Sequence, residues 1–152
     1  MAGNGEGWRG WLRGGRGAPP ATWNFRVERE RGAVGRLNDT LERTLLPAIP
    51  ETALRALQVA LDELLTNVIM HAEQAAGAIE VEIAHSRSQL DTRIRYIADE
   101  FDPTRWQSTP HGMTIAASQI GGLGLQLVRS LMDEFRHEYA DGMNVVSLKK
   151  RC

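Results

Sequence analysis

Residues 51–72, ETALRALQVALDELLTNVIMHA, decide the fold of this chain. At about 100° per residue, most of the apolar side chains of this segment fall within one arc of a helix surface. The members of the arc are Leu54, Leu57, Leu61, Leu64, Leu65, Val68, Ile69 and Ala72. Pro47 and Pro50 lie just before the segment and mark its start. The pattern predicts a long helix over Glu51–Ala72 that packs one face against a core.

The same helix carries a polar strip away from the narrow charged stripe that we expect to face solvent. Glu63, Asn67 and His71 follow one another at intervals of four residues, beside the small side chains of Ala56 and Ala60. Small residues next to a carboxylate, an amide and an imidazole are typical of the wall of a polar cavity between a helix and a sheet. The alternative is a helix that is exposed over a wide arc, with these groups solvated.

The chemistry of this strip fits a nucleotide. The amide oxygen of Asn67 is a suitable ligand for Mg²⁺, which takes few protein ligands and completes its shell with water and phosphates. The carboxylate of Glu63, one helical turn earlier, is suited to polarising an incoming hydroxyl group or water in phosphoryl transfer.

The rest of the chain predicts a sheet and two more helices. Alternation of large and charged residues indicates strands at 22–30, 78–85 and 90–99, and two short strands at about 135–139 and 143–149 flank the Asp141-Gly142 turn. Helical spacing indicates helices over 33–46 and in the run that starts at Leu125. We therefore predict an α+β fold, a two-layer α/β sandwich in which three helices cover one face of a mainly antiparallel sheet.

Composition narrows the class of protein. The chain has 152 residues, 42% hydrophobic and 24% charged, as expected for one soluble domain. A net charge of −1 removes the electrostatic drive for general nucleic-acid binding, so we expect no direct nucleic-acid partner. The single cysteine, Cys152, excludes an intramolecular disulfide and a cysteine-rich zinc site. No membrane span or secretory signal is visible, and we expect a cytoplasmic protein without membrane contact.

Two segments fall outside this pattern of helices and strands. Residues 1–21 are rich in glycine and arginine and predict a flexible tail ahead of a folded domain at 22–152. Residues 101–120 form a long irregular segment, which in a compact domain is usually functional or mobile.

Gly121, Gly122 and Gly124 lie where this irregular segment passes into a helix. Unpaired amides at a helix N-terminus attract phosphate, and glycine allows the backbone to approach it closely. The pattern is neither a P-loop nor a dinucleotide fingerprint. An ordinary loop-to-helix turn would contain the same glycines.

Three segments together carry a family resemblance: LDELLTNVIMHA (61–72), IADEFDPT (97–104) and GGLGLQLVRSLMDEFRHEYADGMNVVSLKK (121–150). The chain resembles the anti-sigma-factor serine/threonine kinases, small members of the histidine-kinase-like (GHKL) ATPase superfamily with the Bergerat ATP-binding fold. The similarity extends from about Trp23 to the C-terminus in matching element order.

The resemblance implies roles for individual residues. Asn67 would coordinate the Mg²⁺ of bound ATP, Glu63 would be the general base, and Asp99 would meet the adenine amino group. The segment expected to close over the phosphates is Gly121, Gly122, Leu123, Gly124 and Leu125. Residues 100–120 would then form a mobile lid. His71 matches a frequent position of the family's helix motif, but no catalytic role follows for it.

The turn after Asp99 departs from the family pattern. The family usually has glycine within a few residues of the adenine-binding aspartate, whereas here Glu100 leads directly into Phe101, Asp102 and Pro103. Glycine there lets the backbone approach the base, so the shortened turn puts adenine affinity in question. Asp102 is a second candidate for the polar contact with the base.

The resemblance also implies partners. A kinase of this type acts as an anti-sigma factor in partner switching: it binds a sigma factor or equivalent target, and it phosphorylates an anti-anti-sigma antagonist protein on serine. A homodimer is compatible with the resemblance. Two alternatives remain, a non-catalytic sequestering module with a degenerate nucleotide pocket and the ATP-binding domain of a histidine kinase. The final segment follows the anti-sigma pattern more closely than the histidine-kinase pattern.

Overall fold

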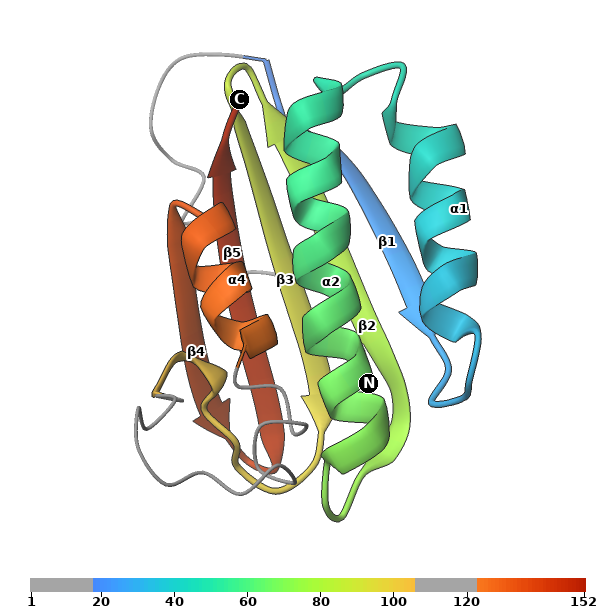
Figure 1. Ribbon diagram of the computed structural model, residues 1–152, viewed down its shortest axis with the longest axis vertical. Coiled ribbons are helices and arrows are strands. Elements are labelled where there is room, and N and C mark those ends of the chain that lie inside the picture. The colour runs from blue at the N-terminus through green and yellow to red at the C-terminus, as the bar shows by residue number, and fades with distance from the viewer. Residues whose placement is uncertain (1–17, 106–122) are drawn as a thin grey trace.

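The computed structural model describes residues 18–105 and 123–152 (Figure 1). Its elements, in chain order, are β1 (Ala21–Val27), α1 (Ala33–Leu45), α2 (Glu51–His71), β2 (Ala76–Ser86), β3 (Gln89–Ile97), the short 3₁₀ helix η1 (Pro103–Arg105), α4 (Leu123–Leu131), β4 (Glu134–Ala140) and β5 (Met143–Arg151). The predicted α+β class and the predicted order of helices and strands are confirmed.

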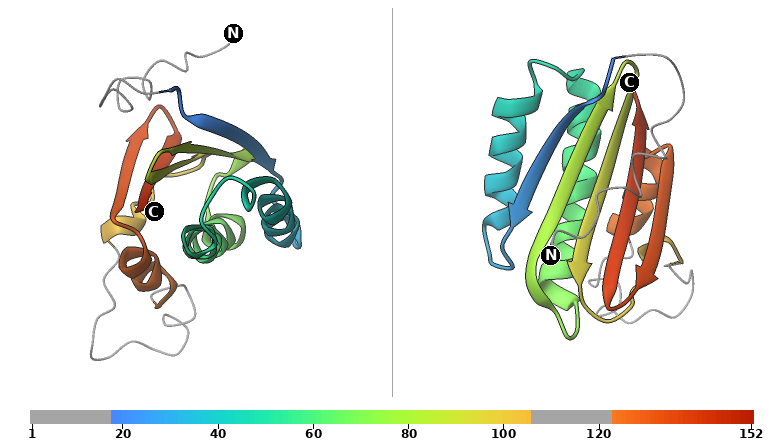
Figure 2. Two further views of the ribbon diagram at one scale, coloured as in Figure 1. Left: turned by 90° about the horizontal axis from the view of Figure 1, so that it is seen from above. Right: turned by 180° about the vertical axis from the view of Figure 1, so that it is seen from behind.

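The five described strands form one sheet in the order β1-β2-β3-β5-β4, and every neighbouring pair is antiparallel. Figure 2 shows helices α1, α2 and α4 on the same face of this curved sheet. Asp141 and Gly142 both have positive φ, 54° and 76°, and form the tight turn between β4 and β5. The predicted two-layer sandwich is therefore confirmed.

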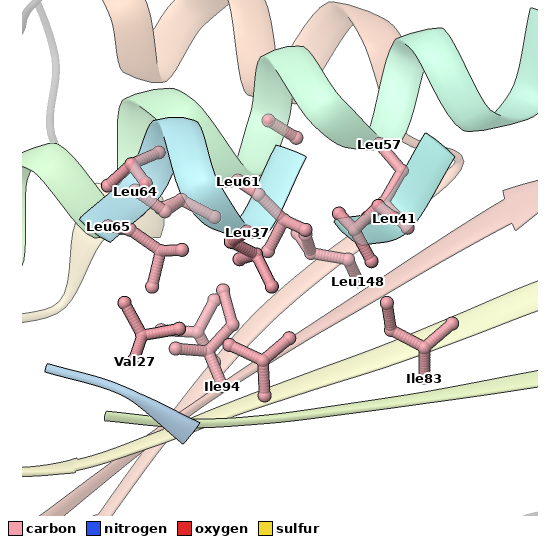
Figure 3. Close-up of a cluster of buried hydrophobic side chains, with 14 of the residues drawn as sticks. Val27, Leu37, Leu41, Leu57, Leu61, Leu64, Leu65, Ile83, Ile94 and Leu148 are labelled. Carbon is pink, nitrogen blue, oxygen red and sulfur yellow. The ribbon is translucent and has the colours of Figure 1, made fainter. Parts of the chain in front are cut away.

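The core lies between α2 and the middle of the sheet. Figure 3 shows the leucines of α2 directed at aliphatic side chains of the strands. Leu61 and Leu65 are fully buried in α2, and Ile83 of β2 and Ile94 of β3 are buried opposite them. Full burial of one such side chain contributes about 1.5–3 kcal/mol to folding. These contacts fix α2 against the sheet along its length, including the C-terminal half of the helix.

The last helix, α4, ends at Leu131. The backbone N–H of Met132 closes the final turn on the carbonyl of Val128, and the N–H of Asp133 bonds instead to the carbonyl of Lys149, 2.8 Å away. Pairing of Phe135 with Leu148 then places the chain in the sheet. From Asp133 onwards, hydrogen bonds to β5 therefore replace the hydrogen bonds of the helix.

Several predictions concern residues that the structure does not describe. Residues 1–17 of the expected tail, residues 106–120 of the expected lid, and Gly121 and Gly122 of the expected phosphate-closing segment lie outside the described ranges. Within the described ranges, no helix has both the length and the apolar character needed to cross a membrane.

Candidate nucleotide-binding site

A cavity of about 300 Å³ lies between the C-terminal half of α2, strands β3 and β5, and the turn that follows β3. Its apolar floor includes Leu64, Ile94 and Val146, and Asn67 and Asp99 are among the polar groups that line it. The volume is at the lower end of the range of about 300–1,000 Å³ found for small-molecule sites, which combine apolar walls with a few convergent polar groups. The cavity is therefore suited to a ligand with a flat apolar part and polar ends.

Asn67 is one of the polar groups that α2 contributes to the cavity. Its amide nitrogen is shielded from solvent and has no hydrogen-bond partner among the described residues. A buried amide without a partner destabilises a fold by about 1–3 kcal/mol, so a ligand that pairs with it would recover that energy. No group of three or more His, Cys, Asp or Glu side chains within the described ranges is arranged to hold a metal ion. The predicted Mg²⁺ site thus rests on the Asn67 amide together with phosphate oxygens, a small protein contribution that Mg²⁺ accepts.

Glu63 lies one helical turn before Asn67, is half-buried and does not line the cavity. It packs instead against the start of α4. A Cβ atom on Gly124 would lie 1.9 Å from Glu63 Oε2 and 2.6 Å from its Cδ. Only glycine leaves room for the carboxylate in this position, and the contact brings the predicted base next to the predicted phosphate-closing segment.

The turn after β3 forms the opposite wall. Asp99 lines the cavity, and its backbone N–H donates a hydrogen bond of 2.9 Å to the carbonyl of Glu73, just beyond the end of α2. Asp102 does not line the cavity, because its carboxylate accepts hydrogen bonds from the backbone N–H and the hydroxyl of Thr104 at 2.9 and 2.6 Å. The geometry therefore favours Asp99 over Asp102 as the group that meets a base.

Asp102 is held in its ionised form by its surroundings. Burial raises its pKa, but the two hydrogen bonds from Thr104 and the nearby His137 and Arg105 outweigh burial and leave the pKa below its ordinary value. His137 Nδ1 lies 3.8 Å from Asp102 Oδ1, and the His137 side chain is only 3% exposed. Asp102 therefore has a structural role at the start of η1.

A family model for the histidine kinase-like ATPase domain matches residues 25–150. The chain belongs to this family. The α2 wall, the turn after β3 and the start of α4 are accordingly parts of an ATPase domain, and the predicted superfamily is confirmed.

Curated relatives of this ATPase domain include protein kinases. A serine-protein kinase RsbW of Listeria monocytogenes is 35% identical over 103 residues, which are 64% of this chain and 66% of that protein. The serine/threonine-protein kinase BtrW of Bordetella bronchiseptica is 30% identical over 94 residues, 60% of this chain and 66% of that protein. The chain thus spans just under two thirds of these relatives, and they confirm the predicted resemblance.

A solved structure shares the fold. The RsbU and RsbW domains of Rv1364c from Mycobacterium tuberculosis match with a TM-score of 0.61 at 15% identity. The match covers 88% of this chain and 33% of that one. At this identity the similarity supports the arrangement of helices and strands alone.

The predicted site residues do not all lie in the cavity. Asn67 and Asp99 line one cavity, while Glu63 and Gly124 contact each other beside it. Leu123 begins α4, and Leu125 is 1% exposed in the core, which leaves only its backbone for a ligand. Gly121 and Gly122 lie outside the described residues.

His71 lines the cavity, as the helix pattern predicted, although no catalytic role was assigned to it. Tyr96 and Phe101 also line the cavity and were not predicted. Burial raises the pKa of Tyr96 to about 12, although the positive charge of Arg29, 6.0 Å from the ring centre, works against that rise. The alternation of LDTRIRYIAD already places Tyr96 on the same face as Ile94, and this was the signal available for it.

Proposed function

We propose that this protein is an ATP-dependent serine/threonine kinase that acts as an anti-sigma factor in a partner-switching system. It binds a sigma factor or an equivalent target in the cytoplasm, and it phosphorylates a serine of a small antagonist protein. The observation that carries the proposal is that Asn67 and Asp99, from two different elements, line the same cavity. The relatives named as serine-protein kinases support the choice of acceptor.

The proposed chemistry assigns one task to each residue. Asn67 would hold Mg²⁺ together with phosphate oxygens, and Mg²⁺ supplies neutralisation of the charge on the transferring phosphoryl group when it is bound. Asp99 would accept a hydrogen bond from the adenine amino group. Glu63 would take the proton of the serine hydroxyl as its oxygen attacks the γ-phosphorus and ADP leaves.

Phosphoryl transfer tests the catalytic part of the proposal. The full chain is incubated with labelled ATP, Mg²⁺ and its small antagonist protein, and we expect label on a serine of the antagonist. Glu63→Gln should reduce the rate by about 100-fold or more, in the range of general-base catalysis. The matched control is Asp62→Asn, an exposed carboxylate one position away. No transfer by the wild type, or equal transfer by Glu63→Gln, contradicts the kinase proposal.

Calorimetry with ATP and Mg²⁺ separates a kinase from a sequestering module. Asn67→Ala should lose most of the ATP affinity, whereas Thr66→Ala, an exposed neighbour on α2, should keep it. A wild-type protein that binds its target but not ATP would support the sequestering module instead.

A further inference from the structure

The main chain around Asp99 is fixed on both sides. Its N–H donates to the carbonyl of Glu73 at 2.9 Å, and its carbonyl accepts a hydrogen bond of 3.0 Å from Asn144 Nδ2. Two residues further on, the N–H of Phe101 donates to Asn144 Oδ1 at 3.1 Å. Only Glu100 lies between these anchored positions, so the position of the Asp99 main chain, from which its side chain extends, is set by contacts from other elements.

Asn144 of β5 makes four hydrogen bonds and has no exposed surface. Besides the contacts with Asp99 and Phe101, Nδ2 donates to the carbonyl of Ala98 at 3.3 Å, and Oδ1 lies 2.8 Å from His137 Nε2. The two carbonyls require the amide nitrogen on their side, and this orientation makes Oδ1 the acceptor for both other contacts. One side chain therefore holds the start and the end of the turn at once.

This anchoring explains how the turn forms without glycine. None of residues 98–105, all of which the structure describes, has a positive φ. The backbone therefore has no need of the left-handed conformation that glycine adopts most easily. Side-chain hydrogen bonds from the sheet define the turn instead.

We propose that Asn144 is a positioning residue for adenine recognition, which fixes the main chain of residues 98–101 and so directs the Asp99 carboxylate at the base. This inference rests on the proposed function. A carboxylate accepts a hydrogen bond from the amino group of adenine, whereas guanine presents a carbonyl oxygen at the equivalent ring position and leaves the acceptor unpaired. Asn144 thereby sets the preference for ATP over GTP without touching the nucleotide.

The test measures the dissociation constants of ATP and GTP, each with Mg²⁺, for the full chain. Asn144→Asp keeps the size of the side chain and an acceptor for Phe101, but it replaces the two N–H donors by an oxygen that faces carbonyl oxygens. We expect ATP affinity to fall by about 10-fold, the value of one well-placed hydrogen bond, and GTP affinity to change by less than about 2-fold. The ratio of the two affinities distinguishes positioning from a general loss of folded protein.

Two further variants keep the test decisive. Ile83→Val, at a fully buried position in β2 that pairs with Thr92 in the middle of β3, weakens the core away from the turn and should leave the ATP:GTP ratio unchanged. If Asn144→Asp does not fold, His137→Phe removes one hydrogen-bond partner of the Asn144 amide and should lower the ratio by about 3-fold.

Failure of the inference and failure of the proposed function give different results. A ratio that falls in Asp99→Ala but not in Asn144→Asp overturns the role of Asn144 and leaves the ATP site intact. A wild-type protein that binds neither nucleotide contradicts the ATP site itself, and the inference about Asn144 with it.

Discussion

The two walls of the cavity are held by different kinds of interaction. The helix wall, with Asn67, belongs to α2, which also carries Glu63 beside the cavity, and the buried leucines of that helix fix it to the sheet. The turn wall, with Asp99, is fixed by the amide of Asn144, which lies 45 positions away in the sequence. Apolar packing tolerates small shifts, whereas a buried amide with four partners requires each of them.

Because of this difference, substitutions in the two walls should have different effects on the protein. A change in the helix wall should alter the chemistry of the site and leave the fold intact. A change behind the turn wall should alter the fold and the shape of the site together. The predictions below test this distinction.

The largest effect is expected for Asn144→Leu. Leucine has the same branched arrangement of side-chain heavy atoms as asparagine, but it cannot donate to the buried carbonyl of Ala98 or to the part-buried carbonyl of Asp99. Each unpaired group costs about 1–3 kcal/mol, so the free energy of unfolding should fall by about 3 kcal/mol or more in a urea titration.

Thr92→Val is the matched control for Asn144→Leu. Thr92 is 3% exposed in β3, and its hydroxyl has no hydrogen-bond partner among the described residues. Its replacement should leave the unfolding free energy unchanged or raise it. A loss in Thr92→Val as large as that in Asn144→Leu would show that the turn wall has no special dependence on its amide.

Gly124→Ala, unlike Asn144→Leu, should lower the activity and leave the stability nearly unchanged. The added methyl group collides with the end of the flexible Glu63 side chain, which can rotate away. Alanine also favours the helix by about 1 kcal/mol over glycine. We expect unfolding free energy within about 1 kcal/mol of the wild type, and phosphoryl transfer slower by about 10-fold or more because the carboxylate has moved.

A control separates displacement of Glu63 from other effects of the new methyl group. In a Glu63→Gln background, Gly124→Ala should cause little further loss of transfer, since the two changes act on the same carboxylate. Independent, multiplicative losses would contradict this explanation.

A smaller effect on stability is expected from the ionisation of Asp102 as the pH changes. The pKa of Asp102 lies below its ordinary value in the folded state, so its ionised form stabilises the fold at pH values above the unfolded pKa of about 3.9. This contribution is lost as the pH falls through the folded pKa. Asp102→Asn keeps an acceptor for Thr104, and it should be less stable than the wild type at pH 7 and approach it at pH 3 in urea titrations.

The pKa of Asp91 is shifted in the opposite direction to that of Asp102, so its effect on stability has the opposite dependence on pH. Burial raises its pKa, although its hydrogen bonds with Gln89 and the charge of Lys149 oppose the rise. Stability from this group is therefore present below the unfolded pKa and lost as the pH rises through the folded one. Asp91→Asn should be more stable than the wild type at pH 7, and an equal difference at pH 3 would contradict the assignment to charge.

The smallest effect is expected away from both walls. Arg55 of α2 forms exposed ion pairs with Glu42 and Glu51 and donates a hydrogen bond to Gln58 at 3.0 Å. Exposed pairs are screened by water and salt. Arg55→Met should leave the urea midpoint unchanged within error at high salt, and a clear loss there would mean that this cluster is more than a surface feature.

The helix wall was largely predictable from sequence. Asn67 and Glu63 were placed outside the core arc because helical spacing depends only on neighbours along the chain. The same spacing did not reveal that Gly124 of α4 lies against Glu63, because these two residues are far apart in the sequence.

The turn wall was predictable only in part. Asp99 was found through a family motif, but the missing glycine suggested a weakened pocket. Asn144 holds the turn in the absence of that glycine. In the sequence MNVVSLKK it is visible as a polar residue on the face shared by Val146 and Leu148. Its partners follow from the register that pairs it with Tyr96, and a single sequence does not fix that register.

The anchoring of the turn by β5 also has a consequence for the order of folding. Phe101 and Asn144 are 43 positions apart, so the loop that joins them closes late compared with the turns of α2. A nascent chain can form the helix wall before β4 and β5 have been synthesised, but the turn wall can form only after β5, the last strand. Nucleotide binding would then report that the final hairpin has docked, and ATP would add its stabilisation only to chains that have completed the sheet.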